Sequence, residues 1–175
     1  MSDPGASVKR GFVVFLGVYG VVCMTRPESA WLLNSVDLAI HETGHLVFTP
    51  FGEFLHFLGG TLFQLIVPLA FVASFLRRGD RFAAAVGLWW VAQNLWNIAV
   101  YAADARSQLL PLVGGGVHDW AYLLGRMNLL AHDQLVARAI HLIGILVFGA
   151  SVVMAWRSAS GREAGQCNPL PVRGV

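Results

Sequence analysis

The sequence predicts an all-α membrane protein with about four transmembrane helices and one further helix that either re-enters the membrane or lies at its surface. Of the 175 residues, 56% are hydrophobic and only 13% are charged, which lies outside the usual range of soluble globular domains. Four apolar runs have, or nearly have, the roughly 17 to 25 residues that a helix needs to cross the hydrocarbon core. These runs are residues 11–24, 54–76, 82–103 and 135–156.

The first run, residues 11–24, is the shortest and follows Lys9 and Arg10. A short apolar stretch behind basic residues is also typical of a secretory signal peptide. The sequence VYGVVCMTRPESAW that closes the run has no clear small-x-small cleavage site. We therefore expect a retained span, with cleavage after the run as the alternative.

The next segment, VDLAIHETGHLVFTPFG at 36–52, contains two histidines, a glutamate and an aspartate in an apolar setting. Cytoplasmic loops carry the excess of Lys and Arg. If this segment does not cross, eight basic residues lie on the side of the N-terminus and three on the other side. The eight are Lys9, Arg10, Arg77, Arg78, Arg81, Arg157, Arg162 and Arg173, and the three are Arg26, Arg106 and Arg126. If it crosses as a fifth span, seven fall outside, so we expect both termini in the cytoplasm and this segment near the outer surface.

The second run, residues 54–76, carries polar and small residues along one helical face. His56, Gly60 and Gln64 are spaced i, i+4, i+8, which places them on one stripe of a helix. Gly59 and Gly60 would let another backbone approach this helix closely.

The third run, residues 82–103, also predicts a helix with one polar face. Gln93, Asn97 and the following Asp104 fall on one stripe, with Tyr101 at its edge. For amides such as Asn97, hydrogen bonds between helices are the simplest interpretation.

The last run, residues 135–156, follows His132 and Asp133, which we interpret as surface residues or as the N-cap of this helix. His141 lies inside the run, where we expect a hydrogen bond to a neighbouring helix. Beyond the run the chain is polar and rich in Gly, Ser and Pro, with too little apolar area to order itself. We therefore expect a single integral membrane domain over residues 1–156 and a disordered polar tail over 157–175.

The sequence HETGH is an HExxH pattern, in which His41 and His45 lie one turn apart on the same helical face. Two imidazoles in this arrangement can share one zinc ion, Zn²⁺. Glu42 lies about 100° around the helix, where a carboxylate can act as a general base without being a ligand. Asp37 or Asn34 could accept the free ring N–H of a ligating histidine.

A catalytic zinc ion usually has three protein ligands, so a third ligand must come from elsewhere in the chain. Asp104 directly follows the third run, and His118 lies in the loop VGGGVHDW on the same predicted outer side. We rank Asp104 and His118 equally and Asp119 below them. Alternatively, His118 only caps a helix that starts near Asp119, or anchors the chain at the membrane interface together with Trp120.

HExxH on an apolar helix of a small polytopic chain, with an acidic residue after a later span, resembles the site-2 protease class of intramembrane zinc metallopeptidases. The resemblance implies a zinc ion bound by His41, His45 and a later aspartate, with Asp104 as the best match. It also implies that Glu42 activates water to cut a peptide bond. The chain departs from the class because no LDG motif follows an Asn-Pro-rich segment, and because the predicted site faces outward. The motifs YAADAR and HDW also resemble a separate bacterial membrane family, which implies the bacterial inner membrane.

Three classes of function remain open. A zinc-dependent metallopeptidase, acting on a membrane protein or a peptide, accounts for both the histidines and Glu42. A metal-binding membrane protein without proteolytic activity has no need of that base, and a structural or partner-binding protein of the lipid bilayer would hold no metal. The scattered basic residues predict no nucleic-acid interface, and Cys23 and Cys167 suggest neither a disulfide nor a metal site.

Overall fold

A computed structural model describes residues 4–112 and 116–160, and every regular element within them is helical. The all-α prediction is therefore confirmed for this part of the chain. The α-helices are α1 (Pro4–Thr25), α2 (Trp31–Phe48), α3 (Glu53–Arg77), α4 (Arg81–Ala103), α5 (Asp119–Arg126) and α6 (Asp133–Ala159). Short 3₁₀ turns, η1 (Pro27–Ala30), η2 (Thr49–Phe51) and η4 (Leu130–His132), precede α2, α3 and α6.

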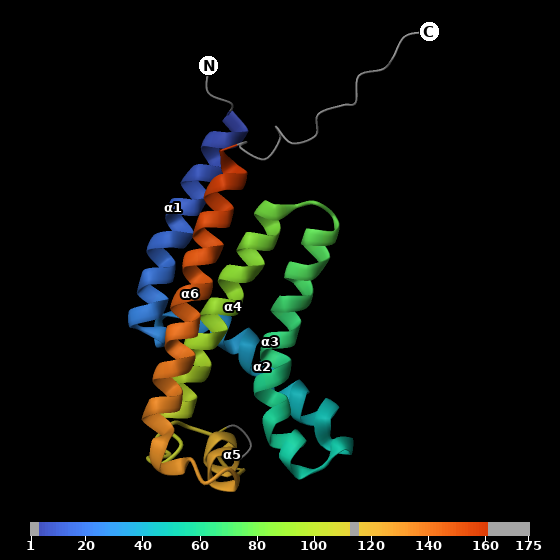
Figure 1. The fold of residues 1–175 in the computed structure, drawn as a ribbon, viewed down its shortest axis with the longest axis vertical. Helices are drawn as coiled ribbons and strands as arrows, with labels where there is room; N and C mark the ends of the chain where they lie inside the picture. The colour runs from blue at the N-terminus through green and yellow to red at the C-terminus, as the bar shows by residue number, and fades with distance from the viewer. Residues whose placement is uncertain (1–3, 113–115, 161–175) are drawn as a thin grey trace.

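Helix α4 is the centre of the bundle (Figure 1). It packs along α6 and α3, while α1 packs on α6 and α4. Helix α2 packs on α3, and α5 lies at the end of the molecule away from the start of α1 (Figure 1). Thus α2 and α5, which are far apart in the sequence, both lie near the start of α3 and the end of α4.

Tight turns set the directions of α3 and α4. Gly79 adopts a φ of 76° after α3, a conformation that favours glycine. The Asp80 carboxylate then accepts a hydrogen bond from the Ala83 N–H at 2.9 Å, which caps the first turn of α4. Before α3, Gly52 has a φ of 97°, so the chain reverses from α2 into α3 through η2.

Three helical segments are long and apolar enough to cross a membrane: Gly5–Thr25, Glu53–Arg77 and Leu130–Ala159. The fourth predicted span, α4, is not among them. Its 23 residues include Gln93, Asn94 and Asn97, which lower its hydropathy. These amides are tolerated because α4 is enclosed by α1, α3 and α6, where Gln93 and Asn94 are buried.

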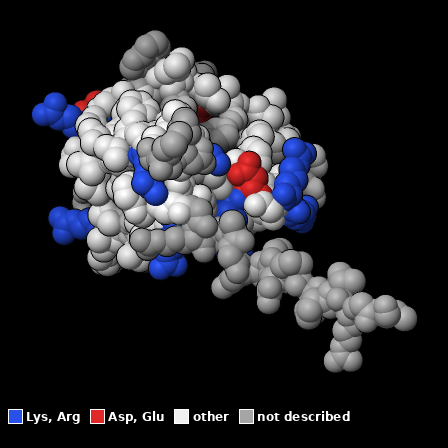
Figure 2. Space-filling model, turned by 90° about the horizontal axis from the view of Figure 1, so that it is seen from above, with Lys and Arg blue, Asp and Glu red and all other residues white. Residues whose placement is uncertain are grey.

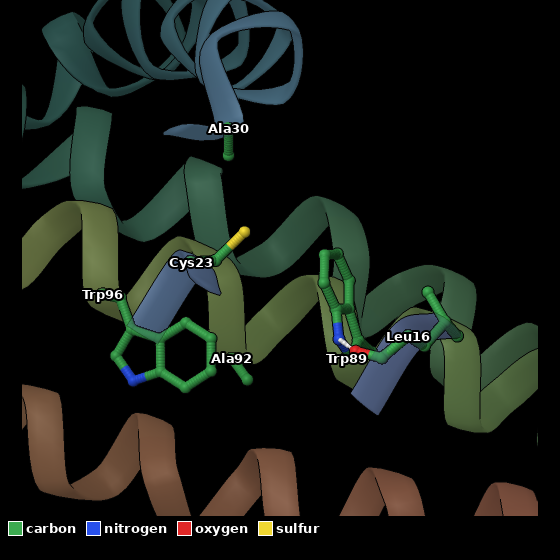
Figure 3. Packing of buried hydrophobic residues seen from close by; sticks show 6 residues of the cluster. All are labelled: Leu16, Cys23, Ala30, Trp89, Ala92 and Trp96. Atoms are coloured by element: carbon green, nitrogen blue, oxygen red, sulfur yellow. Dashed lines mark hydrogen bonds between the residues drawn. The ribbon is translucent and has the colours of Figure 1, made fainter. Parts of the chain in front are cut away.

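Aromatic packing joins α4 to α1. Figure 3 shows Trp89, Ala92 and Trp96 of α4 beside Leu16 and Cys23 of α1. The indole N–H of Trp89 donates to the carbonyl of Leu16 at 2.9 Å. This hydrogen bond satisfies the polar atom of a buried tryptophan and fixes the register of α1 against α4.

One end of the bundle is basic. The start of α1, the α3–α4 turn and the end of α6 point toward it (Figure 1), and the charged side chains visible from this end are mostly Lys and Arg (Figure 2). The last helix also runs further than expected: α6 continues to Ala159, so residues 157–159 of the predicted tail are helical. Residues 161–175 lie outside the described part of the chain.

Candidate metal centre

Helix α2 and the start of α5 bring two histidines and one aspartate together. His41 and His45 lie one turn apart on α2, as the HExxH pattern predicts. The Oδ2 atom of Asp119 lies 2.8 Å from Nε2 of His41 and 3.2 Å from Nε2 of His45. Each residue offers one ligand atom, and these atoms lie within 4.8 Å of one another, so the group could hold a metal ion. We call this candidate site, which comprises His41, His45 and Asp119, the metal centre.

His45 is oriented by the backbone of α3. Its Nδ1 lies 2.8 Å from the carbonyl oxygen of His56, and since a carbonyl can only accept, Nδ1 carries the proton. His56 in turn places its own Nδ1 at 3.1 Å from the carbonyl oxygen of His45. This reciprocal pair of hydrogen bonds joins the end of α2 to the first turn of α3 and aims Nε2 of His45 at Asp119.

His41 is oriented by two amide side chains. Its Nδ1 donates to Oε1 of Gln64 on α3 at 3.1 Å, and Nε2 of Gln64 donates to Oδ1 of Asn97 on α4 at 3.1 Å. From the sequence we expected Asp37 or Asn34 in this role, but both form hydrogen bonds with other residues. Asp37 accepts from the indole of Trp90, and Asn34 from the side-chain amide of Gln93. The hydrogen bond between Gln64 and Asn97 is of the interhelical kind expected for these amides.

This arrangement of protons fits a metal ion. With the proton on Nδ1, neutral His45 would turn the lone pair of Nε2 toward the carboxylate oxygen of Asp119, which is unfavourable. Either a proton or a cation between the two atoms removes this conflict. Two imidazoles whose Nδ1 atoms donate to oxygen acceptors, together with one carboxylate, form a common ligand set for divalent metals.

Without an ion, the same contacts shift the pKa values of the group. Hydrogen bonding to Asp119 raises the pKa of His45 above its ordinary value, although burial opposes the shift. Burial acts to raise the pKa of Asp119, but the hydrogen bonds and charges of His41 and His45 outweigh it and lower that pKa. The metal centre therefore attracts positive charge, whether from protons or from a metal ion.

Two glycines of α3 make room for α2. A Cβ atom on Gly60 would lie 2.5 Å from Nε2 of His41, and one on Gly59 would lie 2.9 Å from the carbonyl oxygen of Gly44. Both distances are shorter than side chains tolerate. The glycine pair noted in the sequence therefore admits the Gly44 backbone and the His41 ring.

Asp104 and His118, the residues ranked first as third ligand, lie outside the metal centre. The Asp104 carboxylate accepts hydrogen bonds from the Ser107 hydroxyl at 2.6 Å and from the N–H groups of Leu109 and Leu110 at 3.0 and 2.9 Å. These bonds hold the loop that follows α4. His118 lies with Nε2 at 3.6 Å from Asp104 Oδ2.

The structure bears out the alternative interpretation of His118 as a helix cap. Its Nδ1 accepts a hydrogen bond from the Ala121 N–H at 3.3 Å, in the first turn of α5. Burial lowers the pKa of His118, which favours the neutral ring that this cap requires. Because His118 is the cap, the next residue, Asp119, begins α5 and points into the metal centre. In the sequence, the adjacent pair His118 and Asp119 indicated that one of these two residues could be the third ligand. Which of the two side chains reaches the histidines depends on the loop before them.

The metal centre opens into a cavity of about 820 Å³. His41, His45 and Asp119 line it together with Glu42 and with apolar residues of α2, α3, α4 and the loop before α5. Glu42 is partly exposed, and within the described part of the chain its carboxylate has no hydrogen-bond partner. A free carboxylate therefore faces the space beside the possible ligands.

The remaining polar candidates have other partners. Arg106 forms a bidentate ion pair with the buried Asp133, at 2.7 and 2.8 Å, which ties the loop after α4 to the start of α6. His132 occupies the N-cap position of α6 without a side-chain cap bond. His141 packs near the ring of Trp96 in the bundle.

Comparison with known proteins gives no match for this chain among family models, curated proteins or solved structures.

Proposed function

We propose that the protein is an integral membrane zinc hydrolase in which His41, His45 and Asp119 bind the ion and Glu42 is the general base. One observation carries the proposal. A single carboxylate oxygen of Asp119 faces the Nε2 atoms of both histidines, and each histidine donates its other ring N–H to an oxygen acceptor. Fixing the Nδ1 proton in this way leaves Nε2 free to bind a metal.

Zinc is the metal that best suits this ligand set. Two imidazole nitrogens and one carboxylate oxygen are the ligands of many hydrolytic zinc sites, which leave the remaining position open. A zinc ion bound there would polarise a carbonyl group and lower the pKa of a bound water molecule. The protein side chains would then orient the substrate and move protons.

Glu42 supports hydrolysis over simple metal storage. It lies next to His41 in sequence and lines the same cavity, and it has no described partner that would account for it structurally. As a base, Glu42 would take a proton from water and deliver it to the leaving group. A peptide bond is the substrate class that the HExxH pattern favours, so we propose a metallopeptidase; metal binding without proteolysis is the alternative.

We further propose that α4 crosses the membrane together with the three apolar helices. Helix α2 would then re-enter the membrane or lie at the outer surface near α5. The basic end of the bundle supports this orientation, since Lys and Arg concentrate on the cytoplasmic side. Both termini would then be cytoplasmic in the bacterial inner membrane, and the cavity would open toward the outer side.

Metal analysis of the purified full-length protein tests the core of the proposal. We expect about one zinc per chain after purification in detergent without chelators. His45→Ala should remove the ion, while His132→Ala, a histidine outside the metal centre, should retain it. Absence of any transition metal from the unmodified protein, even after dialysis against micromolar zinc, would rule out the hydrolase.

A further inference from the structure

Tyr101 of α4 is held beside the metal centre by three contacts. Its ring packs against the His118 ring in a tilted arrangement, with centroids 4.2 Å apart and planes at 30°. The rings of Tyr101 and His41 meet edge to face, with centroids 6.0 Å apart and planes at 73°. Its hydroxyl oxygen accepts a hydrogen bond from the Asp119 N–H at 3.4 Å. The hydroxyl is therefore fixed next to one of the proposed ligands.

The hydroxyl proton of Tyr101 is available to a ligand. A phenol can accept hydrogen bonds and donate one, and here the Asp119 N–H uses the oxygen as an acceptor. Among the described residues, no group accepts the Tyr101 proton, and Tyr101 lines the cavity. The phenol O–H therefore faces the cavity as a donor.

A second donor lies on the same face of α4. Asn97 precedes Tyr101 by four residues, which places the two side chains next to each other on the helix. Asn97 uses Oδ1 to accept from Gln64, and its amide N–H groups have no acceptor among the described residues. Both residues line the cavity, so α4 presents two unsatisfied donors to the space beside His41.

We propose that Tyr101 is a ligand-binding residue that donates a hydrogen bond to an oxygen atom of a carbonyl-type compound, such as an amide, ester or hydroxamate, held at the metal centre. Carbonyl oxygens accept hydrogen bonds, and the acceptor becomes stronger as negative charge develops on it. This assignment extends the proposed function and depends on metal binding by His41, His45 and Asp119, but it does not require that the protein cleaves peptides.

Cobalt substitution gives a test that is independent of turnover. The full-length protein in detergent is loaded with Co²⁺, and acetohydroxamate is titrated while the visible absorption of the cobalt ion is followed. Tyr101→Phe keeps the ring and its packing against His118 but removes the hydroxyl. We expect this variant to bind cobalt like the unmodified protein and to bind acetohydroxamate about tenfold more weakly, as for the loss of one hydrogen bond to a charged ligand.

Tyr19→Phe is the matched control, because Tyr19 of α1 stacks on Trp89 away from the cavity; its acetohydroxamate affinity should stay unchanged. Equal affinity in Tyr101→Phe and the unmodified protein would overturn the role of Tyr101 while leaving the metal centre intact. Loss of cobalt from Tyr101→Phe would also overturn it, by showing that the hydroxyl only positions Asp119. If the unmodified protein binds no cobalt, both the metal centre and the role of Tyr101 are wrong.

Discussion

The imidazole of His45 donates its Nδ1 proton to the backbone carbonyl of His56, 2.8 Å away. A backbone carbonyl cannot be removed by a change of side chain, so this contact fixes the tautomer of His45 whichever residue occupies position 56. The first turn of α3 therefore serves as a rigid support for a proposed metal ligand on α2.

Asp119→Asn should weaken zinc binding at least about tenfold, because a neutral amide is a poorer ligand than a carboxylate. Asp104→Asn is the matched change, since the structure uses Asp104 to hold loop N–H groups. That variant should keep its zinc and lose about 1 to 3 kcal/mol of stability. Competition with a zinc-sensitive dye and thermal unfolding in detergent measure the two effects. If Asp104→Asn lost zinc and Asp119→Asn kept it, Asp104 would be the third ligand.

Gly60→Ala should reduce zinc affinity by about 10- to 100-fold, the usual range when a ligand's support is disturbed. The added Cβ would lie 2.5 Å from Nε2 of His41, so the imidazole must shift from its position beside Asp119. Gly149→Ala on α6 is the control, because a Cβ there meets no atom within 4 Å. The same dye competition measures both variants, and equal affinities would show that the His41 ring is not confined as the structure has it.

Glu42→Gln should leave zinc content near normal and lower peptide cleavage by about 10²-fold or more, since glutamine keeps the size of the side chain but cannot take up a proton. Cleavage is measured on a library of fluorescence-quenched peptides, with zinc determined on the same samples. If the unmodified protein contains zinc but cleaves none of these peptides, the non-proteolytic metal-binding alternative becomes the better account. Undiminished cleavage by Glu42→Gln would mean that another group is the base.

A cysteine introduced at Ala131, in η4, should react with a membrane-impermeant maleimide added outside intact cells. One introduced at Arg78, in the α3–α4 turn, should react only after the cells are opened. Both positions are exposed and lie toward opposite ends of the bundle. The prediction follows from the concentration of basic residues at one end, and the reverse labelling pattern would invert the proposed orientation.

The parts of the site that depend on local spacing could be predicted from the sequence. The spacing of the HExxH pattern was enough to predict that His41 and His45 share one face of a helix, because both residues belong to the same helix, α2. Which of Asp104, His118 and Asp119 lies against the two histidines could not be predicted, because it depends on how the loop between α4 and α5 folds. In the structure, backbone N–H groups of that loop donate hydrogen bonds to the Asp104 carboxylate. His118 accepts a hydrogen bond from the first turn of α5 as its N-cap.

The same distinction explains the helices. The apolar runs gave the positions of α1, α3, α4 and α6, since each has enough hydrophobic residues in sequence. They did not indicate that α4 would be the central helix, where neighbouring helices rather than its own composition accommodate Gln93 and Asn94. The partner of His41 was missed for a similar reason, because Gln64 reaches it across the α2–α3 interface.

The proposed ligands lie far apart in the order of synthesis, with His41 and Asp119 separated by 78 positions. Both histidines leave the ribosome before α3 and α4 have been made, and the carboxylate follows only after those helices. A nascent chain that ends within α4 therefore carries two of the three proposed ligands and lacks the third. Metal uptake would then be a late event of biogenesis, which follows membrane insertion of the hairpin between α2 and α5.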